Sequence, residues 1–408
     1  AMGRTRELAD ALWSGTKSTR DLQPVSLLLG LEEMQPGLAF VSSFGNLTAL
    51  RGDDGLTLID TGGFFLAGQN HASVREWCED PLRVAIYTHG HVDHAFGVPP
   101  FEAESHGKAE VIAHEAVRDR FDRYQLTAGY NRVINGRQFG VAAWPSEYRY
   151  PDRTYRDRLE LVVGGEQLEL VHARGETDDH TYVWMPQRKV LCPGDLFIWA
   201  SPNCGNPQKV QRFPREWAAA LRQMSALGAE LLLPGHGPPI EGKDRVEQAL
   251  SETAELLEFL VEATLERMNA GLRLDAILAE VKAPARLLER PYLRPVYDEP
   301  EFIVRNLWRL YGGWWDGNPA NLKPAPEAAV AREIVDLAGG APALVARAEA
   351  LAEQGDLALA AHLVELAWQA LPSDPEVRRV RSRIYAARAD AEVSLMATSI
   401  FRATADES

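Results

Sequence analysis

The chain has 408 residues, enough for two or three domains of ordinary size. Hydrophobic residues make up 46% and charged residues 25%, which is typical of a globular protein and excludes a disordered or low-complexity chain. The 43 Lys and Arg against 58 Asp and Glu give a formal net charge of −15. Because an acidic surface repels phosphate backbones and anionic lipids, we expect neither nucleic acid nor membrane as a partner.

Cysteines and the N-terminus bear on the compartment. Three cysteines are too few for a disulfide framework, which favours a reducing environment. No apolar run reaches the length of about 18 residues that a transmembrane helix needs. The N-terminus shows no apolar signal segment, although Ala1 before Met2 resembles a cloning remnant, so that a native leader could have been removed. We expect a cytoplasmic protein.

Up to residue 242, short apolar or alternating runs are bounded by Gly, Pro and Asp, which predicts strands. The expected strands are Leu38–Ser42, Leu56–Ile59, Val84–Thr88, Val111–Ala113, Leu159–Val163, Glu169–Val171, Thr181–Met185 and Lys189–Cys192. Helical spacing between them predicts helices at Gly68–Glu79, His114–Arg123 and Arg215–Leu227. This mixture indicates a layered α/β domain over residues 36–242, preceded by an N-terminal extension at 1–35.

From residue 243 to 408 the pattern is helical. Expected helices are Arg245–Ala270, Leu274–Glu280, Phe302–Tyr311, Pro326–Leu337, Ala341–Gln354, Asp356–Ala370 and Asp374–Met396. The Ala-rich pair over 341–370 resembles a tetratricopeptide unit, but one pair is not a repeat array. We therefore expect a helical bundle.

The segment His89-Gly90-His91-Val92-Asp93-His94 follows the apolar run Val84–Tyr87, at the end of a predicted strand. Three imidazoles and a carboxylate within six residues offer the mixed N/O donor set that Zn²⁺ or a similar metal prefers. Four donors this close together also suit two adjacent ions, with His89 and His91 toward one and Asp93 and His94 toward the other.

Further donors follow later strands. Glu176, Asp178, Asp179 and His180 precede the run Thr181–Met185, Asp195 follows Lys189–Cys192, and His236 follows Leu231–Leu233. Open sheets gather ligands in loops just past their strands, so these groups are expected to join the histidine motif.

The histidine motif, the Gly194-Asp195 turn and the Pro234-Gly235-His236-Gly237 turn resemble the metallo-β-lactamase superfamily, as does Leu58-Ile59-Asp60-Thr61-Gly62. The resemblance implies an αββα sandwich with a dinuclear metal site along one edge. It also implies that Asp60 orients a metal ligand by a hydrogen bond without binding the metal itself.

Glu176 points to one branch of that superfamily. It stands ten residues before Pro186, where most members have His, and a glutamate there resembles the alkylsulfatases, or class III sulfatases. That branch keeps a bridging carboxylate 19 residues later, here Asp195, where it usually has Glu. Residues 311–322 resemble the signature of its helical dimerisation domain. The resemblance thus implies a homodimer formed through residues 243–408, and an alkylsulfatase without the family's C-terminal sterol-carrier-like domain.

The same resemblance implies a mechanism. Two Zn²⁺ ions per chain would provide a bridging hydroxide that cleaves an organic (alkyl) sulfate ester, a small anionic molecule. The implied ligands are His89, His91, Asp93, His94, Glu176, Asp195 and His236. Asp93, His180 and Asp195 are the predicted catalytic residues, with the role of His180 open between ligand, orienting partner and general acid.

The family holds its sulfate with an Asn and an Arg shortly after the bridging carboxylate. The corresponding stretch contains Asn203, Asn206, Lys209 and Arg212, but not at the family's spacing. We predict these four residues, together with Tyr130, as substrate-binding.

Two alternatives remain. A phosphodiester, phosphonate or carboxylic ester hydrolase could use the same metal centre. A metal-binding scaffold protein that recruits partners through its helical half is a third hypothesis.

Overall fold

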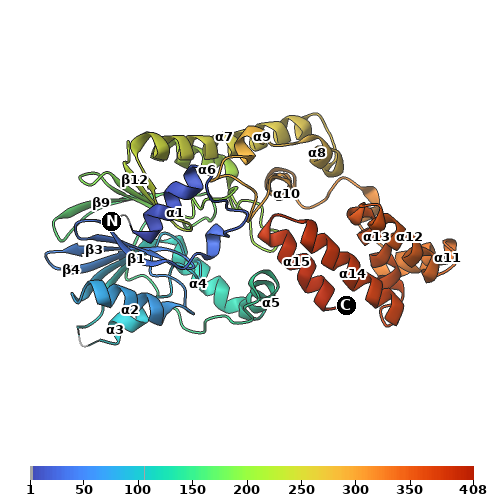
Figure 1. The fold of residues 1–408 in the computed structure, drawn as a ribbon, viewed down its shortest axis with the longest axis horizontal. Helices are drawn as coiled ribbons and strands as arrows, with labels where there is room; N and C mark the ends of the chain where they lie inside the picture. The colour runs from blue at the N-terminus through green and yellow to red at the C-terminus, as the bar shows by residue number, and fades with distance from the viewer. Residues whose placement is uncertain (1–2, 105) are drawn as a thin grey trace. The chain divides into compact units, whose positions relative to one another are not determined.

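The computed structural model describes residues 3–104 and 106–408. Two β-sheets form the centre of the first part of the chain (Figure 1). One sheet has seven strands in chain order: β1 (Gly30–Gln35), β2 (Leu38–Ser42), β3 (Leu47–Gly52), β4 (Gly55–Ile59), β5 (Leu82–Ile86), β6 (Glu110–His114) and β7 (Arg153–Tyr155). The other has six strands, in the order β13 (Ile240–Glu241), β12 (Leu231–Pro234), β11 (Val190–Gly194), β10 (Thr181–Met185), β9 (Glu166–His172) and β8 (Arg158–Val163).

The two sheets pack face to face. Their shared core takes Phe40 and Ile86 from one sheet and Val183, Cys192 and Leu233 from the other. Every residue of β2, β10 and β11 is buried, because one face of each strand meets the opposite sheet and the other face meets helices.

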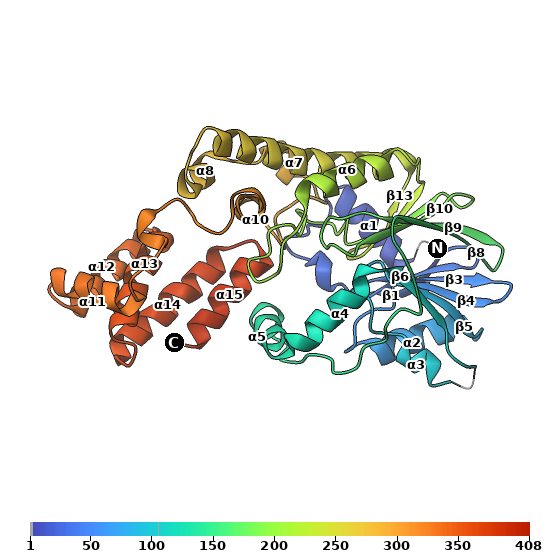
Figure 2. The same ribbon diagram turned by 180° about the vertical axis from the view of Figure 1, so that it is seen from behind.

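Helices cover the outer faces of both sheets (Figures 1 and 2). Helices α2 (Ala67–Trp77) and α4 (Ala116–Leu126) pack on the seven-stranded sheet. Helices α6 (Pro214–Ser225) and α7 (Lys243–Asn269) cover the six-stranded sheet, and α10 (Pro300–Gly312) packs against α7. The expected αββα sandwich is confirmed. Three shorter helices complete this part: α3 (Pro99–Glu102), α8 (Leu274–Glu280) and α9 (Ala285–Leu288).

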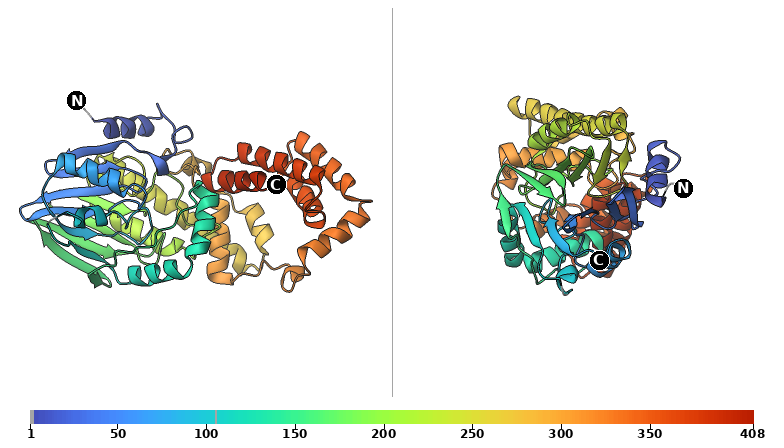
Figure 3. Two further views of the ribbon diagram at one scale, coloured as in Figure 1. Left: turned by 90° about the horizontal axis from the view of Figure 1, so that it is seen from below. Right: turned by 90° about the vertical axis from the view of Figure 1, so that its left-hand side faces the viewer.

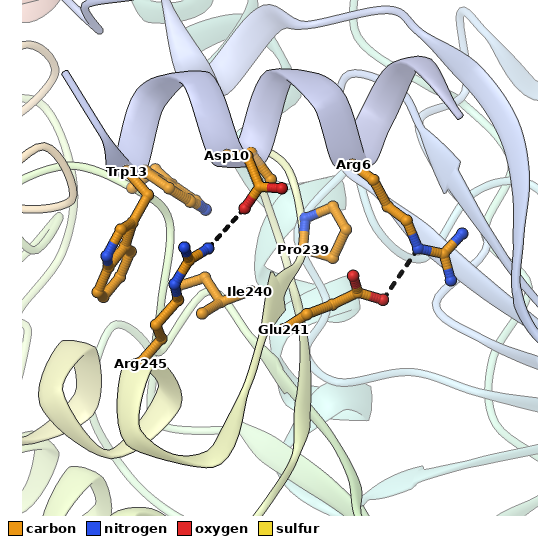
Figure 4. A pocket seen from close by; sticks show the side chains of 9 residues that line it. Arg6, Asp10, Trp13, Pro239, Ile240, Glu241 and Arg245 are labelled. Carbon is orange, nitrogen blue, oxygen red and sulfur yellow. Dashed lines mark hydrogen bonds and ion pairs between the residues drawn. The ribbon is translucent and has the colours of Figure 1, made fainter. Parts of the chain in front are cut away.

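Helix α1 (Arg4–Trp13) is fixed to β13 and the start of α7 by two ion pairs (Figure 4). Arg6 Nε lies 2.9 Å from Glu241 Oε1, and Arg245 Nη1 lies 2.6 Å from Asp10 Oδ1. The Arg245 guanidinium also lies over the Trp13 ring, 5.3 Å from its centroid. Leu8 and Leu12 enter the core beneath the helix, so the N-terminal segment is an integral part of this layer.

The described residues divide into two compact units. The first comprises residues 1–131, 144–272 and 276–312, and the second comprises 132–143, 273–275 and 313–408. The second unit includes most of α5 (Ala128–Phe139). It also holds a bundle of α11 (Glu327–Leu337), α12 (Ala341–Glu353), α13 (Leu357–Ala370), α14 (Pro375–Ala391) and α15 (Leu395–Asp406) (Figure 3). The domain boundaries expected from the sequence, at 35/36 and 242/243, stay a prediction.

Two expected helices need correction. The single helix Asp374–Met396 is two helices, because the Ser394 side chain accepts the Ala397 N–H at 3.2 Å and begins α15. The helix expected to start at His114 starts two residues later. His114 ends β6, and its Nδ1 accepts the Ala116 N–H at 3.2 Å. Among the described residues, no helix combines the length and apolar character needed to cross a membrane.

Candidate metal centre

The histidine motif forms a tight loop just after β5. Within it, the backbone N–H groups of His94 and Ala95 both donate to the His91 carbonyl, each at 3.1 Å. The His94 carbonyl accepts the Thr61 N–H at 2.7 Å, which ties the loop to the end of β4. These bonds turn the side chains of the loop toward one another.

The first group of candidate ligands contains His89, His91, Glu176 and Asp195, whose donor atoms all lie within 4.8 Å of one another. His89 Nε2 lies 2.9 Å from His91 Nδ1. Glu176 Oε2 lies 3.4 Å from each of these nitrogens. Glu176 comes from the loop between β9 and β10, and Asp195 directly follows β11, so three separate segments supply this group.

The second group contains Asp93, His94 and His236. The Nε2 atoms of His94 and His236 lie 3.3 Å apart, and Asp93 Oδ2 lies 3.5 Å from the first and 3.2 Å from the second. Asp195 contacts both groups. Its Oδ1 lies 3.1 Å from His94 Nε2, and its Oδ2 lies 3.7 Å from His89 Nε2. The Asp195 carboxylate therefore stands between the two groups.

These separations fit metal coordination. Ligands about 2.0–2.2 Å from one ion stand roughly 3–3.5 Å apart in tetrahedral or octahedral geometry. Glu176 Oε2 and Asp195 Oδ1 are buried and accept no hydrogen bond from the described residues. Buried carboxylate oxygens without a donor are unfavourable unless a cation meets them. The residues therefore fit a divalent metal centre.

The charges agree with this interpretation. Burial lowers the pKa of His89 and His91 well below the usual range, so both imidazoles are neutral, as ligands must be. Burial also disfavours charge on His94, but the carboxylates of Asp195 and Asp93 outweigh it and raise the pKa of His94 well above its ordinary value. The carboxylates thus stabilise positive charge at the second group, which a metal ion would supply.

Asp60 contacts the second group through His94, and the orienting role expected of it stays a prediction. Its Oδ2 accepts the Thr88 hydroxyl at 2.7 Å and lies 3.0 Å from His94 Nδ1. Its Oδ1 accepts the Thr88 N–H at 2.7 Å. A carboxylate on Nδ1 leaves Nε2 of His94 as the ligand atom and fixes the orientation of the ring.

Two of the predicted substrate-binding residues, Asn203 and Arg212, are bonded to the predicted metal ligand Glu176. Arg212 Nη1 lies 2.7 Å from Glu176 Oε1, and Asn203 Nδ2 donates to the same oxygen at 2.6 Å. Burial raises the pKa of Glu176 to about 7, and the Arg212 guanidinium opposes that rise. Asn203 and Arg212 thus orient Glu176, and binding of substrate by either one stays a prediction.

The other three predicted substrate residues differ in burial. Asn206 is buried, Lys209 is half-buried and Tyr130 is exposed. Lys209 interacts electrostatically with Arg212, Asp93 and Glu176, and burial lowers the pKa of Lys209 to about 8. The structure thus places a cation beside the centre.

His180 lies inside the site but outside both ligand groups. Its Nε2 accepts the Asp195 N–H at 3.2 Å, and its ring stacks on His89 with centroids 4.7 Å apart. Burial lowers the pKa of His180 to about 3. This arrangement suits a neutral histidine that positions Asp195, and a direct catalytic role stays a prediction.

Sequence reasoning missed an ion pair beneath the histidine motif. The buried Arg120 of α4 donates through Nε to Asp179 Oδ2 at 2.7 Å, and the same oxygen accepts the Gly90 N–H at 2.9 Å. In the sequence, Asp179 is only one of several acidic residues near Glu176. Nothing in the local pattern of α4 marks Arg120, because its partner lies 59 residues away.

The segment before α10 was missed as well. Burial and the negative charges of Asp93 and Glu176 raise the pKa of the buried Tyr297 well above its ordinary value, so its hydroxyl stays protonated beside the centre. Next to it, Asp298 Oδ2 accepts the Gly205 N–H at 2.7 Å. A Cβ on Gly205 would lie 2.2 Å from the carbonyl carbon of Phe302, so only glycine lets this loop approach α10 so closely. Helix α10 thereby holds the loop that carries Asn203 and Arg212.

Comparisons with known proteins agree with the fold and the site. Residues 42–236 match the family model for the metallo-beta-lactamase superfamily, and residues 273–408 match the model for alkyl sulfatase dimerisation. Layered sheets with a histidine and carboxylate cluster at the strand ends therefore make this a metallo-beta-lactamase-fold protein. The chain thus combines a metallo-beta-lactamase superfamily region with an alkyl sulfatase dimerisation region, and alkylsulfatases are among the proteins to which it is similar.

Individual relatives are similar over most of this chain. A linear primary-alkylsulfatase from a Pseudomonas strain is 28% identical over 81% of this chain and 68% of its own length. An (R)-specific secondary-alkylsulfatase from Pseudomonas is 28% identical over 87% of this chain and 59% of its own length. The solved structure of the stereoselective inverting sec-alkylsulfatase Pisa1 from Pseudomonas has a TM-score of 0.84 at 26% identity. It is matched over 93% of this chain and 65% of its own. The chain thus spans about three fifths to two thirds of the length of these relatives.

Proposed function

We propose that the protein is a metal-dependent sulfuric ester hydrolase that cleaves an organic sulfate ester at a dinuclear zinc centre. The observation that carries the proposal is the position of Asp195. Its two carboxylate oxygens lie within 3.7 Å of ligand nitrogens in both groups, as a carboxylate shared between two ions requires. Relatives named as alkylsulfatases support sulfate over other esters.

The two ligand groups divide the metals between them. His89, His91 and Glu176 would hold one ion, and Asp93, His94 and His236 would hold the other, with Asp195 common to both. When bound, two divalent ions supply a hydroxide nucleophile at neutral pH and stabilise anionic oxygens. Imidazole and carboxylate donors in this mixture suit zinc.

The other residues of the site set positions and charge. Asp60 orients His94, His180 orients Asp195, and the Arg212–Asn203 pair holds Glu176. Lys209 carries positive charge where an anionic ester would approach. The buried Tyr297 interacts electrostatically with Asp93 and Glu176, so its hydroxyl could donate a hydrogen bond to a bound ester, while the general acid stays open between Tyr297 and His180.

Metal content measured together with matched substrates tests this function. The purified chain is loaded with zinc, its metal content is measured, and hydrolysis is compared for a sulfate ester and a phosphodiester with the same leaving group. We expect about two metals per chain, a preference for the sulfate and loss of activity with a chelator. An Asp195→Ala variant should lose both activity and one or both metals, while a variant at the exposed Val162 should match the wild type.

Other outcomes redirect the assignment. Two metals with the phosphodiester preferred would keep the centre and move the substrate class. Both esters present tetrahedral oxyanions. Arg212 already pairs with Glu176, so it does not by itself select sulfate over phosphate. No bound metal after zinc loading would refute the hydrolase and favour the scaffold hypothesis. We also propose a homodimer, as the dimerisation match suggests, and light scattering at micromolar concentration would test it.

A further inference from the structure

Most candidate ligands of the metal centre are shielded from solvent. The side chains of His89, His94 and Glu176 are fully buried, and those of Asp195 and His236 are 5% exposed. His91 and Asp93 are the most accessible of the seven, at 15% and 16%. The exposed parts of His91 and Asp93 therefore mark where a substrate can approach the centre, and the residues around these two would contact it.

Phe44 is fixed beside this entrance by its own turn. The next residue, Gly45, has φ +77°, and a Cβ there would lie 1.9 Å from the Asp93 carbonyl oxygen, so only glycine allows the turn to run against the histidine motif. Asn46 ties the same turn to the loop that carries His236, because its side-chain amide donates to the Pro234 and Gly237 carbonyls at 3.0 and 2.8 Å.

The Phe44 ring consequently meets a predicted ligand. It lies edge-on to the His236 ring, with centroids 5.8 Å apart and planes 79° apart. Both ligand loops of the second group, at Asp93 and at His236, thus hold the turn that carries Phe44.

Phe65 lies on the loop between β4 and α2, and its ring is next to that of Phe44. The two ring centroids are 5.5 Å apart. The loop is held to the histidine motif, because the Phe64 N–H donates to the Val92 carbonyl at 3.3 Å. A Cβ on Gly63 would lie 3.1 Å from the Phe65 ring and 3.4 Å from Asp93 Cα, which places Phe65 close to Asp93.

Phe65 is 45% exposed. Single exposed apolar rings are common, but this one borders a buried polar centre, and ligand sites typically combine apolar side chains with a few polar groups. Phe44 is half-buried and extends the same apolar surface toward His236.

A positive charge near the centre complements this apolar surface. Lys209 interacts electrostatically with Asp93 and Glu176, so a cation belongs to the surroundings of the same ligands that Phe65 and Phe44 flank. An ester with an anionic head and an apolar organic group matches both features. A small, fully polar anion would leave the two rings uncovered.

We propose that Phe44 and Phe65 form an aromatic wall that receives the organic group of the ester and determines the preference for longer apolar substrates. The inference rests on the proposed function, because it takes the anionic head from there. Fully burying one methylene is worth about 0.8 kcal/mol, or roughly a fourfold gain in affinity. A half-exposed wall should deliver part of that gain for each methylene that it covers.

Binding of non-hydrolysable alkanesulfonates tests the wall without relying on turnover. Calorimetry on the zinc-loaded full chain would compare ethanesulfonate with hexanesulfonate. For the wild type we expect hexanesulfonate to bind at least about tenfold more tightly. Phe65→Ala and the double variant Phe44→Ala/Phe65→Ala should reduce that ratio to about threefold or less, with ethanesulfonate affinity kept within about twofold. Phe65→Leu, which stays apolar, should keep most of the preference.

A control variant and metal analysis separate this effect from general damage. Val162→Ala removes another exposed apolar side chain, 78% exposed on β8, and should leave both affinities unchanged. Metal content must match the wild type in every variant. The wall is refuted if the wild type binds neither sulfonate or both equally. It is also refuted if Phe65→Ala keeps the ratio, or weakens both ligands to the same extent.

The same experiment distinguishes the wall from the proposed function. Chain-length-dependent binding that Phe65→Ala abolishes, without hydrolysis of any sulfate ester, would support the wall and refute the sulfatase assignment. Hydrolysis of sulfate esters with no dependence of sulfonate binding on chain length would refute the wall alone.

Discussion

Removing Arg120 should loosen the histidine motif although Arg120 is not a predicted ligand. Its guanidinium lies 2.7 Å from Asp179 Oδ2, and both side chains are buried. Burial alone would raise the pKa of Asp179, but Arg120 outweighs burial and holds the pKa below its usual range. In Arg120→Met, the Asp179 carboxylate would keep the Gly90 N–H as a donor but lose its countercharge.

The size of the effect follows from that geometry. Breaking a buried pair by removing one partner typically costs about 3–5 kcal/mol, because the other charge stays buried and unpaired. Asp179→Asn should cost less, about 1–3 kcal/mol, because Arg120 would keep a partner in Asp178, whose side chain is 44% exposed. The double variant should cost less than the two single changes added together, because it leaves no unpaired buried charge.

Urea unfolding of the metal-free protein provides the measurement. Hydrogen exchange of peptides spanning residues 87–95 would report on the motif itself, and zinc titration would report on its function. We expect faster exchange in this segment and weaker zinc binding in Arg120→Met. A loss of stability below about 1 kcal/mol, or strictly additive costs in the double variant, would refute the reasoning.

Three further predictions concern single residues. Asp60→Asn replaces the carboxylate beside His94 Nδ1 and should weaken zinc binding about 10- to 100-fold in a competition titration, with little change in the circular dichroism spectrum. Gly45→Ala should destabilise the protein by more than about 2 kcal/mol in urea unfolding, because its Cβ would clash with backbone. Gly15 also has a positive φ, but the space around it is open. Gly15→Ala therefore serves as the control and should lower the free energy of unfolding by only about 1 kcal/mol. Burial raises the pKa of Asp298 to about 7, so the folded state binds this proton more tightly than the unfolded state. Asp298 should therefore reduce the free energy of unfolding by up to about 4 kcal/mol as pH rises from about 4 to 7, and a wild-type minus Asp298→Ala difference without pH dependence would contradict this.

The sheets were predictable wherever both faces of a strand are buried. Leu38–Ser42 and Thr181–Met185 are continuous apolar runs, and both strands have the expected bounds. Strand β1 escaped prediction because Gly30–Gln35 contains two consecutive glutamates and is mostly half-exposed at the sheet edge. Ser394 begins α15 inside what looks like one helical run, because a capping side chain acts through a local hydrogen bond that does not alter the apolar period.

The candidate ligands were predictable because their residue types and positions after strands are local features. His89, His91 and Asp93 lie within five residues of one another, and Glu176, Asp195 and His236 each fall in a loop at a strand end. Arg120, Asp298 and Tyr297 could not be found in that way. Their roles depend on contacts with residues far along the chain, and no spacing rule links Asp298 to Gly205, which lies 93 residues before it.

The bond between Asp298 and Gly205 also affects the order of events during synthesis. The histidine motif leaves the ribosome early, but two of the hydrogen bonds that hold the loop with Asn203 and Arg212 need Asp298 and Asn306, which follow much later. Asn306 of α10 donates to the Arg212 carbonyl at 3.2 Å, so the anchoring is complete only when the chain has grown past residue 306. Glu176 is oriented by Arg212, so these later residues also support the first ligand group. A chain cut before residue 298 would lack both anchors of the Arg212 loop while keeping His94 and His236, the two histidines of the second group.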